Sequence, residues 1–130
     1  KPWKSIAVLF GGSDSALNAL RSAVQVSQRT GFPLDLFIQM EKDRAYYDQR
    51  IQEAGLEKSL ARCCRQRCEF TDGNFAHNLY ALPHDALVFS GAYGHGLIRN
   101  LLFGSKMEVA QSTLTNSMLV SGPHMSAYLN

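Results

Sequence analysis

Short apolar runs that end in glycine turns and lead into helix-forming segments determine what this chain can fold into. The run Ser5–Phe10 is closed by Gly11 and Gly12, and residues 14–30 then place apolar side chains at helical spacing. Gly31 ends this helix, and Leu34–Gln39 follows as a second apolar run. A strand, a helix and a second strand in close succession predict a parallel βαβ unit.

The same alternation continues to the end of the sequence. A helix is expected over residues 43–66, interrupted at Gly55, and further helices over 75–82 and 105–114. Three more strands are expected at Cys68–Thr71, Ala86–Ser90 and Ser117–Ser121. Residues 1–130 therefore predict one α/β domain, a five-stranded parallel sheet with helices on both faces. Because the chain starts at Lys1, we expect a domain cut from a longer or tandem chain.

Composition excludes several classes of function. With 130 residues and 45% apolar content the chain is long enough for one hydrophobic core. Its net charge of +2 does not indicate binding to nucleic acid. Its apolar runs are too short to enter a bilayer, and no leader precedes them. The chain has three cysteines, Cys63, Cys64 and Cys68, and an odd number is typical of reduced thiols in the cytoplasm. The spacing of these cysteines does not fit a zinc site. We therefore expect a cytoplasmic protein without a metal site or membrane insertion.

The segment Gly91–Ser105 is the main candidate for a binding site. Gly91, Gly94 and Gly96 follow directly on the strand Ala86–Ser90, and Gly104-Ser105 opens the next helix. Glycines after a strand let backbone N–H groups converge on one point, which suits an anion such as a nucleotide phosphate. The Gly11-Gly12 turn falls at the same edge of the predicted sheet, where parallel α/β proteins bind ligands.

The spacing G-x-x-G, nine residues, G-S resembles the nucleotide-binding pattern of the universal stress protein family. Gly91, Gly94, Gly104 and Ser105 match it, and the order of strands and helices agrees over nearly the whole chain. The resemblance implies an adenine nucleotide alpha hydrolase-like fold and a homodimer formed through the last strand, Ser117–Ser121. It also implies that ATP or another adenine nucleotide, with or without Mg, binds through its phosphates to the glycine loop. The expected phosphate-side residues are Gly91, Gly94, His95, Gly96, Gly104, Ser105 and Lys106.

Two positions depart from the family pattern on the adenine side of the site. Nucleotide-binding members usually carry an aspartate just after the first strand, where this chain has Gly11, followed by Gly12. They also carry a small apolar residue at the end of the second strand, where this chain has Gln39. The phosphate half of the expected site is therefore intact, and the adenine half is altered.

Three functions remain open at the level of sequence. The first is an adenine-nucleotide-binding stress-response or regulatory domain without catalysis, since the loop offers only His95 and Lys106 for phosphoryl chemistry. The second is an interaction domain of the same fold that binds no nucleotide, as a tandem half or a soluble domain of a transporter or kinase. The third is an adenylating enzyme, because Phe10–Ser15 is close to the SGGxDS loop of the PP-loop enzymes, although Phe10 replaces the leading serine.

Overall fold

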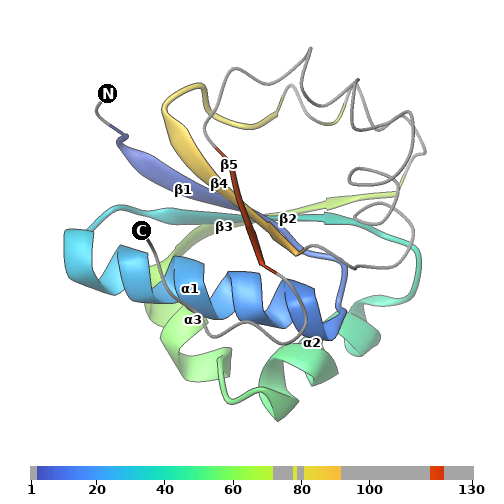
Figure 1. The fold of residues 1–130 in the computed structure, drawn as a ribbon. Coiled ribbons are helices and arrows are strands. Elements are labelled where there is room, and N and C mark those ends of the chain that lie inside the picture. Colours follow the sequence, from blue (N-terminus) through green and yellow to red (C-terminus); the bar gives the residue numbers. More distant parts are fainter. Residues whose placement is uncertain (1–2, 72–77, 79–80, 92–117, 122–130) are drawn as a thin grey trace.

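A computed structural model describes residues 3–71, 78, 81–91 and 118–121, with only the backbone considered for the last segment. Five strands form one sheet in the order β3-β2-β1-β4-β5 (Figure 1). They are β1 Ser5–Leu9, β2 Leu34–Gln39, β3 Cys64–Phe70, β4 Ala86–Gly91 and β5 Met118–Ser121. All four strand pairings are parallel, which confirms the predicted five-stranded parallel sheet.

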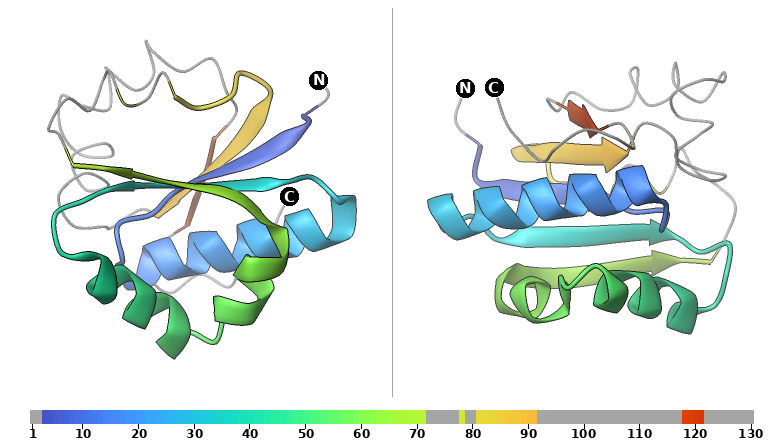
Figure 2. Two further views of the ribbon diagram at one scale, coloured as in Figure 1. Left: turned by 180° about the vertical axis from the view of Figure 1, so that it is seen from behind. Right: turned by 60° about the horizontal axis from the view of Figure 1, so that its bottom comes forward.

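Three helices are described, and all three cover the same face of the sheet (Figure 2). They are α1 Asp14–Thr30, α2 Arg44–Glu53 and α3 Glu57–Cys63. This arrangement follows from the strand order, since right-handed connections from β1 to β2 and from β2 to β3 place their helices on one side. The helix expected over 105–114 lies outside the described residues, as does most of the one expected over 75–82.

Helix α1 begins and ends where its capping residues predict. The Ser13 hydroxyl oxygen accepts from the backbone N–H of Ala16 at 3.1 Å, which caps the first turn. Gly31 ends the helix at φ 78°, and its N–H donates to the Ser27 carbonyl at 2.8 Å. Its apolar side chains, among them Ala16 and Leu20, are buried against the sheet. The predicted βαβ unit is thereby confirmed.

The single helix predicted over residues 43–66 is wrong at its C-terminal end. Gly55 adopts φ 73° and separates α2 from α3, as the predicted interruption required. However, Cys64 is already extended, and β3 runs from there to Phe70 instead of starting at Cys68. The reason is that β3 pairs with β2, and this pairing begins with Cys64 opposite Leu34. Tertiary pairing overrides local helix propensity.

The core lies between the sheet and the three helices. Alternate strand residues point toward the helices, among them Ile6, Val8 and Leu36, and each is fully buried. The residues between them, such as Ala7 and Phe37, are also at most 2% exposed, as expected for a parallel sheet buried on both faces. Among the described helices, none has the length and apolar character needed to cross a membrane.

Candidate functional site

The fold brings the Gly11-Gly12 turn, after β1, and Gly91, the last residue of β4, to one edge of the sheet. Strands β1 and β4 are parallel neighbours with Leu9 opposite Ser90, so Gly11 and Gly91 follow at adjacent strand ends. Gln39 ends β2, on the other side of β1. This carboxyl edge, formed by the ends of β1, β2 and β4, therefore gathers Gly11, Gly12, Gln39 and Gly91, as the sequence predicted.

Gly91 is required for packing. A Cβ at this position would lie 2.5 Å from the backbone nitrogen of Ala16, in the first turn of α1. Because backbone atoms of a capped helix cannot move aside cheaply, only glycine allows β4 to end against α1. The end of β4 therefore lies in contact with the N-terminus of α1, a packing reason for Gly91 beside the phosphate binding that the sequence suggested.

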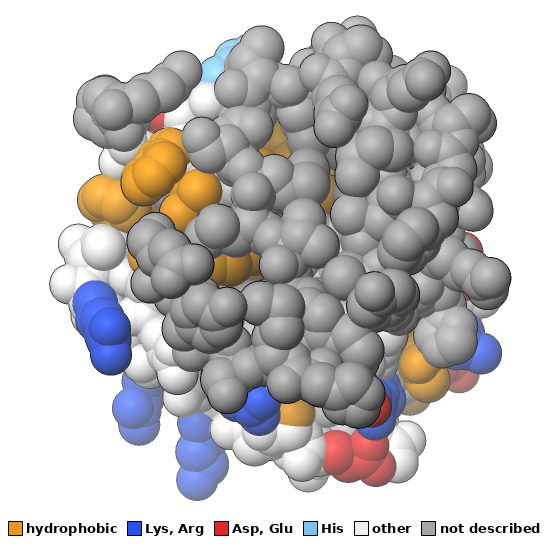
Figure 3. All heavy atoms as spheres, in the orientation of Figure 1, with side chains coloured by type: hydrophobic (Ala, Val, Ile, Leu, Met, Phe, Trp, Pro, Cys, Tyr) orange, Lys and Arg blue, Asp and Glu red, His pale blue; other side chains and the backbone are white. Residues whose placement is uncertain are grey.

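Side chains of α2 hold the turn after β1 in place. Gly12 has φ 87°, and a Cβ there would lie 2.8 Å from the Tyr46 ring. Arg50 Nε donates to the Gly12 carbonyl at 2.8 Å, and its Nη2 donates to the Asp14 carboxylate at 2.7 Å. We call Tyr46 and Arg50 the loop clamp. Figure 3 shows acidic side chains beside basic ones at the lower right, the region of α2 in Figure 1.

The same helix also fixes the turn after β2. The Tyr47 hydroxyl accepts from the backbone N–H groups of Glu41 and Lys42 at 3.1 and 3.3 Å. Its ring is 1% exposed and packs edge-on against Phe10, with centroids 6.3 Å apart. Two loops of the carboxyl edge are thus ordered by one helix. Sequence reasoning missed this, because α2 lies far from Gly12 along the chain and carries no motif.

Gln39 forms an amide pair at the end of β2. Its Oε1 accepts from Nδ2 of Asn78 at 2.7 Å, and Asn78 is 6% exposed. Where the family resemblance leads us to expect a small apolar residue, this chain has two side-chain amides. Amides present both donors and acceptors, the groups that a purine edge needs.

The remaining expected site residues lie outside the described part of the chain: Gly94, His95, Gly96, Gly104, Ser105 and Lys106. Within that part, no group of His, Cys, Asp or Glu side chains is arranged to hold a metal ion. Cys63, Cys64 and Cys68 are free thiols. Burial raises the pKa of Cys64 and Cys68, so both favour the neutral thiol.

No protein-family model matches the sequence, and a search of the curated proteins gave no match. Solved structures do match. One is a universal stress protein in complex with cAMP. It is 20% identical to this chain with a TM-score of 0.63, and the match covers 95% of this chain and 99% of that one. The chain has the universal stress protein fold.

Two other matches are parts of longer chains. A universal stress protein from Archaeoglobus fulgidus DSM 4304 is 20% identical, with TM-score 0.66, and the match covers 92% of this chain and 44% of that one. A macrolide-efflux protein from Streptococcus pneumoniae is 14% identical, with TM-score 0.52, and the match covers 97% of this chain and 47% of that one. In both proteins the match covers less than half of the longer chain.

Proposed function

We propose that this domain binds an adenine nucleotide at its carboxyl edge and acts as a regulatory domain in a stress response, without catalysis. The observation that carries the proposal is the meeting of the two glycine turns, Gly11-Gly12 and Gly91, at adjacent ends of β1 and β4. A solved structure of this fold is a complex with cAMP, which supports an adenine nucleotide as the ligand class.

In this proposal the phosphates bind to backbone N–H groups of the glycine loop. The residues assigned to them are those of the sequence pattern: Gly91, Gly94, His95, Gly96, Gly104, Ser105 and Lys106. A magnesium ion would accompany ATP. Binding alone changes the surface that the loop presents to a partner, so no bond needs to be broken.

Gly11, Gly12 and the Gln39–Asn78 amide pair form the adenine side. Gly11 supplies no carboxylate, so the polar groups for the base must come from elsewhere. Asn78 is buried and Gln39 is half-buried, and the pair lies at the end of β2 beside the glycine turn. Amides therefore replace the family's aspartate as the source of base hydrogen bonds.

Calorimetric titration with Mg-ATP, AMP and cAMP tests the proposal. We expect saturable heat with at least one of the three, and its loss in Gly94→Asp, whose carboxylate would repel the phosphates. Gln28→Asp is the matched control, since it adds the same charge at an exposed position near the far end of α1. Absence of heat with all three nucleotides at millimolar concentration refutes the proposal. Phosphate release from ATP above the buffer rate would contradict the non-catalytic role.

A second candidate is an interaction domain that binds no nucleotide. It is favoured by the efflux protein match, which covers 47% of a longer chain, and by Gly11 in place of an aspartate.

A homodimer through the strand at Ser117–Ser121 fits either candidate, because β5 lies at one edge of the sheet. Light scattering of the wild type and of Leu119→Pro, which removes a strand N–H, tests the dimer.

A further inference from the structure

A cavity lies between α2, α3 and the strands β2 and β3. Its volume is about 290 Å³, and its lining includes Leu36 of β2, Ile51 of α2, and Leu60 and Ala61 of α3. None of its lining residues belongs to the carboxyl edge or to the loop clamp. The cavity is therefore separate from the residues assigned to nucleotide binding.

The floor of the cavity is apolar. Leu36, Ile51 and Leu60 are at most 7% exposed and belong to the main core. Ligand pockets usually measure about 300 to 1,000 Å³, and an apolar cavity of about 150 Å³ suffices for benzene. The size here suits a molecule of one or two rings.

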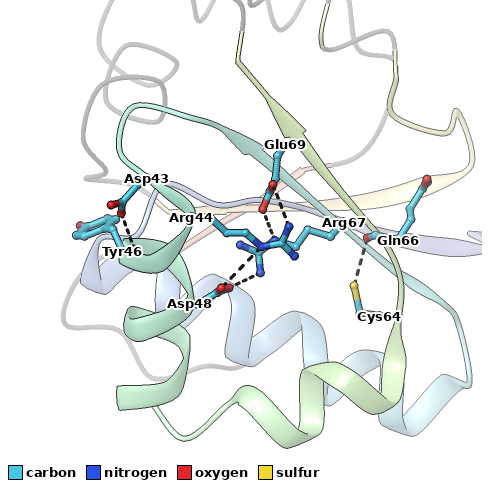
Figure 4. Close-up of polar contacts among 8 residues, drawn as sticks. All are labelled: Asp43, Arg44, Tyr46, Asp48, Cys64, Gln66, Arg67 and Glu69. Atoms are coloured by element: carbon cyan, nitrogen blue, oxygen red, sulfur yellow. Dashed lines mark hydrogen bonds and ion pairs between the residues drawn. The ribbon is translucent and has the colours of Figure 1, made fainter.

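One wall is a charged network that is neutral overall. Arg67 Nη1 donates to Asp48 at 2.6 Å and its Nε to Glu69 at 2.7 Å, and Arg44 lies 3.8 and 3.5 Å from the same two carboxylates (Figure 4). Two arginines thus balance two acids. Arg67 Nη2 is buried and has no hydrogen-bond partner in the described part of the chain, so the guanidinium keeps unused donor capacity. A planar guanidinium of this kind stacks on aromatic rings.

A second carboxylate at the cavity has no counter-charge. Glu57, the first residue of α3, lines the cavity and is exposed, and no ion pair or hydrogen bond of its carboxylate is found within the described residues. Lys58 and Arg62, on the same helix, do not line the cavity. The three charged lining residues, Asp48, Glu57 and Arg67, together carry one net negative charge, which favours a cationic ligand.

We propose that this cavity binds small aromatic amines, with the ring between the apolar floor and the Arg67 guanidinium, and the ammonium group on Glu57. The ring contributes apolar burial, and the ammonium group contributes a charge-assisted hydrogen bond that a neutral or anionic analogue cannot form. The site is a second ligand site of the domain, on the helix-covered face of the sheet.

Three indoles of nearly equal shape test the charge preference: tryptamine (cationic), indole-3-ethanol (neutral) and indole-3-acetate (anionic). We expect tryptamine to bind at least fivefold more tightly than indole-3-ethanol in an NMR titration at low salt, with shifts centred on the amides of Leu60 and Ala61. Indole-3-acetate should bind most weakly. Equal affinities of tryptamine and indole-3-ethanol overturn the proposal.

Two variants locate the site. Glu57→Gln should reduce tryptamine binding to the level of indole-3-ethanol, whereas Glu41→Gln, which removes an exposed carboxylate elsewhere, should not. Ala61→Trp should fill the cavity and abolish binding of tryptamine and indole-3-ethanol, while Ala45→Trp on the exposed side of α2 should leave both unchanged. Both alanines are exposed, so the folds should persist, and circular dichroism checks this. Unchanged binding by Glu57→Gln or by Ala61→Trp overturns the proposal.

Discussion

Asp35 is a fully buried carboxylate in β2, and Arg65 is the residue that makes its burial tolerable. The guanidinium donates from Nε at 3.0 Å to Oδ1 and from Nη2 at 2.6 Å to Oδ2. The Arg65 side chain is 48% exposed, so one end of the pair reaches water. Hydrogen bonding to Asp35 raises the pKa of Arg65. The pair spans the point where the register of β2 and β3 shifts, between Leu34 and Asp35.

Removing the arginine should lower the free energy of unfolding, because the buried Asp35 charge then has no partner. Arg65→Met leaves Asp35 without its partner, and we expect the free energy of unfolding to fall by about 2 to 4 kcal/mol, near the lower end for buried pairs because Arg65 is half-exposed. Urea denaturation at pH 7 measures this. Arg62→Met, at an exposed position of α3, is the control, and adding Asp35→Asn to Arg65→Met should recover part of the loss. A loss no larger than that of Arg62→Met would show that water replaces the arginine.

The thiols of β3 should react slowly. The pKa of Cys64 is raised above 9.0 by burial first and then by Cys63 and Asp35, and that of Cys68 by burial and then by Asp35. At pH 8 we expect iodoacetamide to label both more slowly than in urea, measured by mass spectrometry of peptides. Equal labelling rates with and without urea would contradict this slow reaction.

The raised thiol pKa values also affect stability. Since the unfolded chain loses these protons at lower pH than the folded one, the free energy of unfolding should fall as pH rises above 9.0.

At the scale of elements, local chemistry explains which parts of the fold the sequence predicted. Helix α1 and strand β2 appear within a residue of their expected bounds, because Ser13, Gly31 and the apolar run of β2 act on their immediate neighbours. The boundary between α3 and β3 depends on pairing with β2, so residues 64–66 could not be assigned from propensity.

Parts of the candidate site could likewise be predicted from the sequence, and others are seen only in the structure. The positions of Gly11, Gln39 and Gly91 follow from strand order, which the alternating pattern predicts. The loop clamp depends on Arg50 reaching Gly12, 38 positions away in sequence, and no periodicity encodes such a contact. The reason for glycine at position 91, close approach to Ala16, is likewise visible only in three dimensions.

The loop clamp should determine how well ordered the turn after β1 is. Arg50→Ala removes the hydrogen bond to the Gly12 carbonyl and the ion pair with Asp14, and we expect a loss of about 1 to 2 kcal/mol. Backbone amides of residues 11–14 should exchange with solvent faster, which hydrogen-exchange mass spectrometry detects. Arg29→Ala, at an exposed position in the last turn of α1, should change neither. Unchanged exchange in Arg50→Ala would mean that the turn is held by its own backbone.

At the scale of the whole molecule, the sheet carries two different edges and two separate candidate ligand sites. The β3 edge is covered with charged side chains, among them Arg65 and Arg67, which disfavours pairing with another strand. The carboxyl-edge site and the cavity beside α3 both use strand β2, but they share no residue, since Gln39 ends the strand at the edge and Leu36 lines the cavity. A ligand at one should therefore leave the affinity of the other nearly unchanged.

Nucleotide binding at the carboxyl edge should stabilise the entire domain, because the unfolded chain has no such site. At a concentration about one hundred times the Kd the gain is about 2.7 kcal/mol, which for a domain of this size raises the Tm by roughly 8 to 14 °C. Differential scanning fluorimetry with increasing nucleotide measures the shift. Gly94→Asp should show none, Arg50→Ala a smaller shift at equal concentration, and Glu57→Gln the full shift, because Glu57 belongs to the other site. A full shift in Gly94→Asp would place the nucleotide away from the glycine loop.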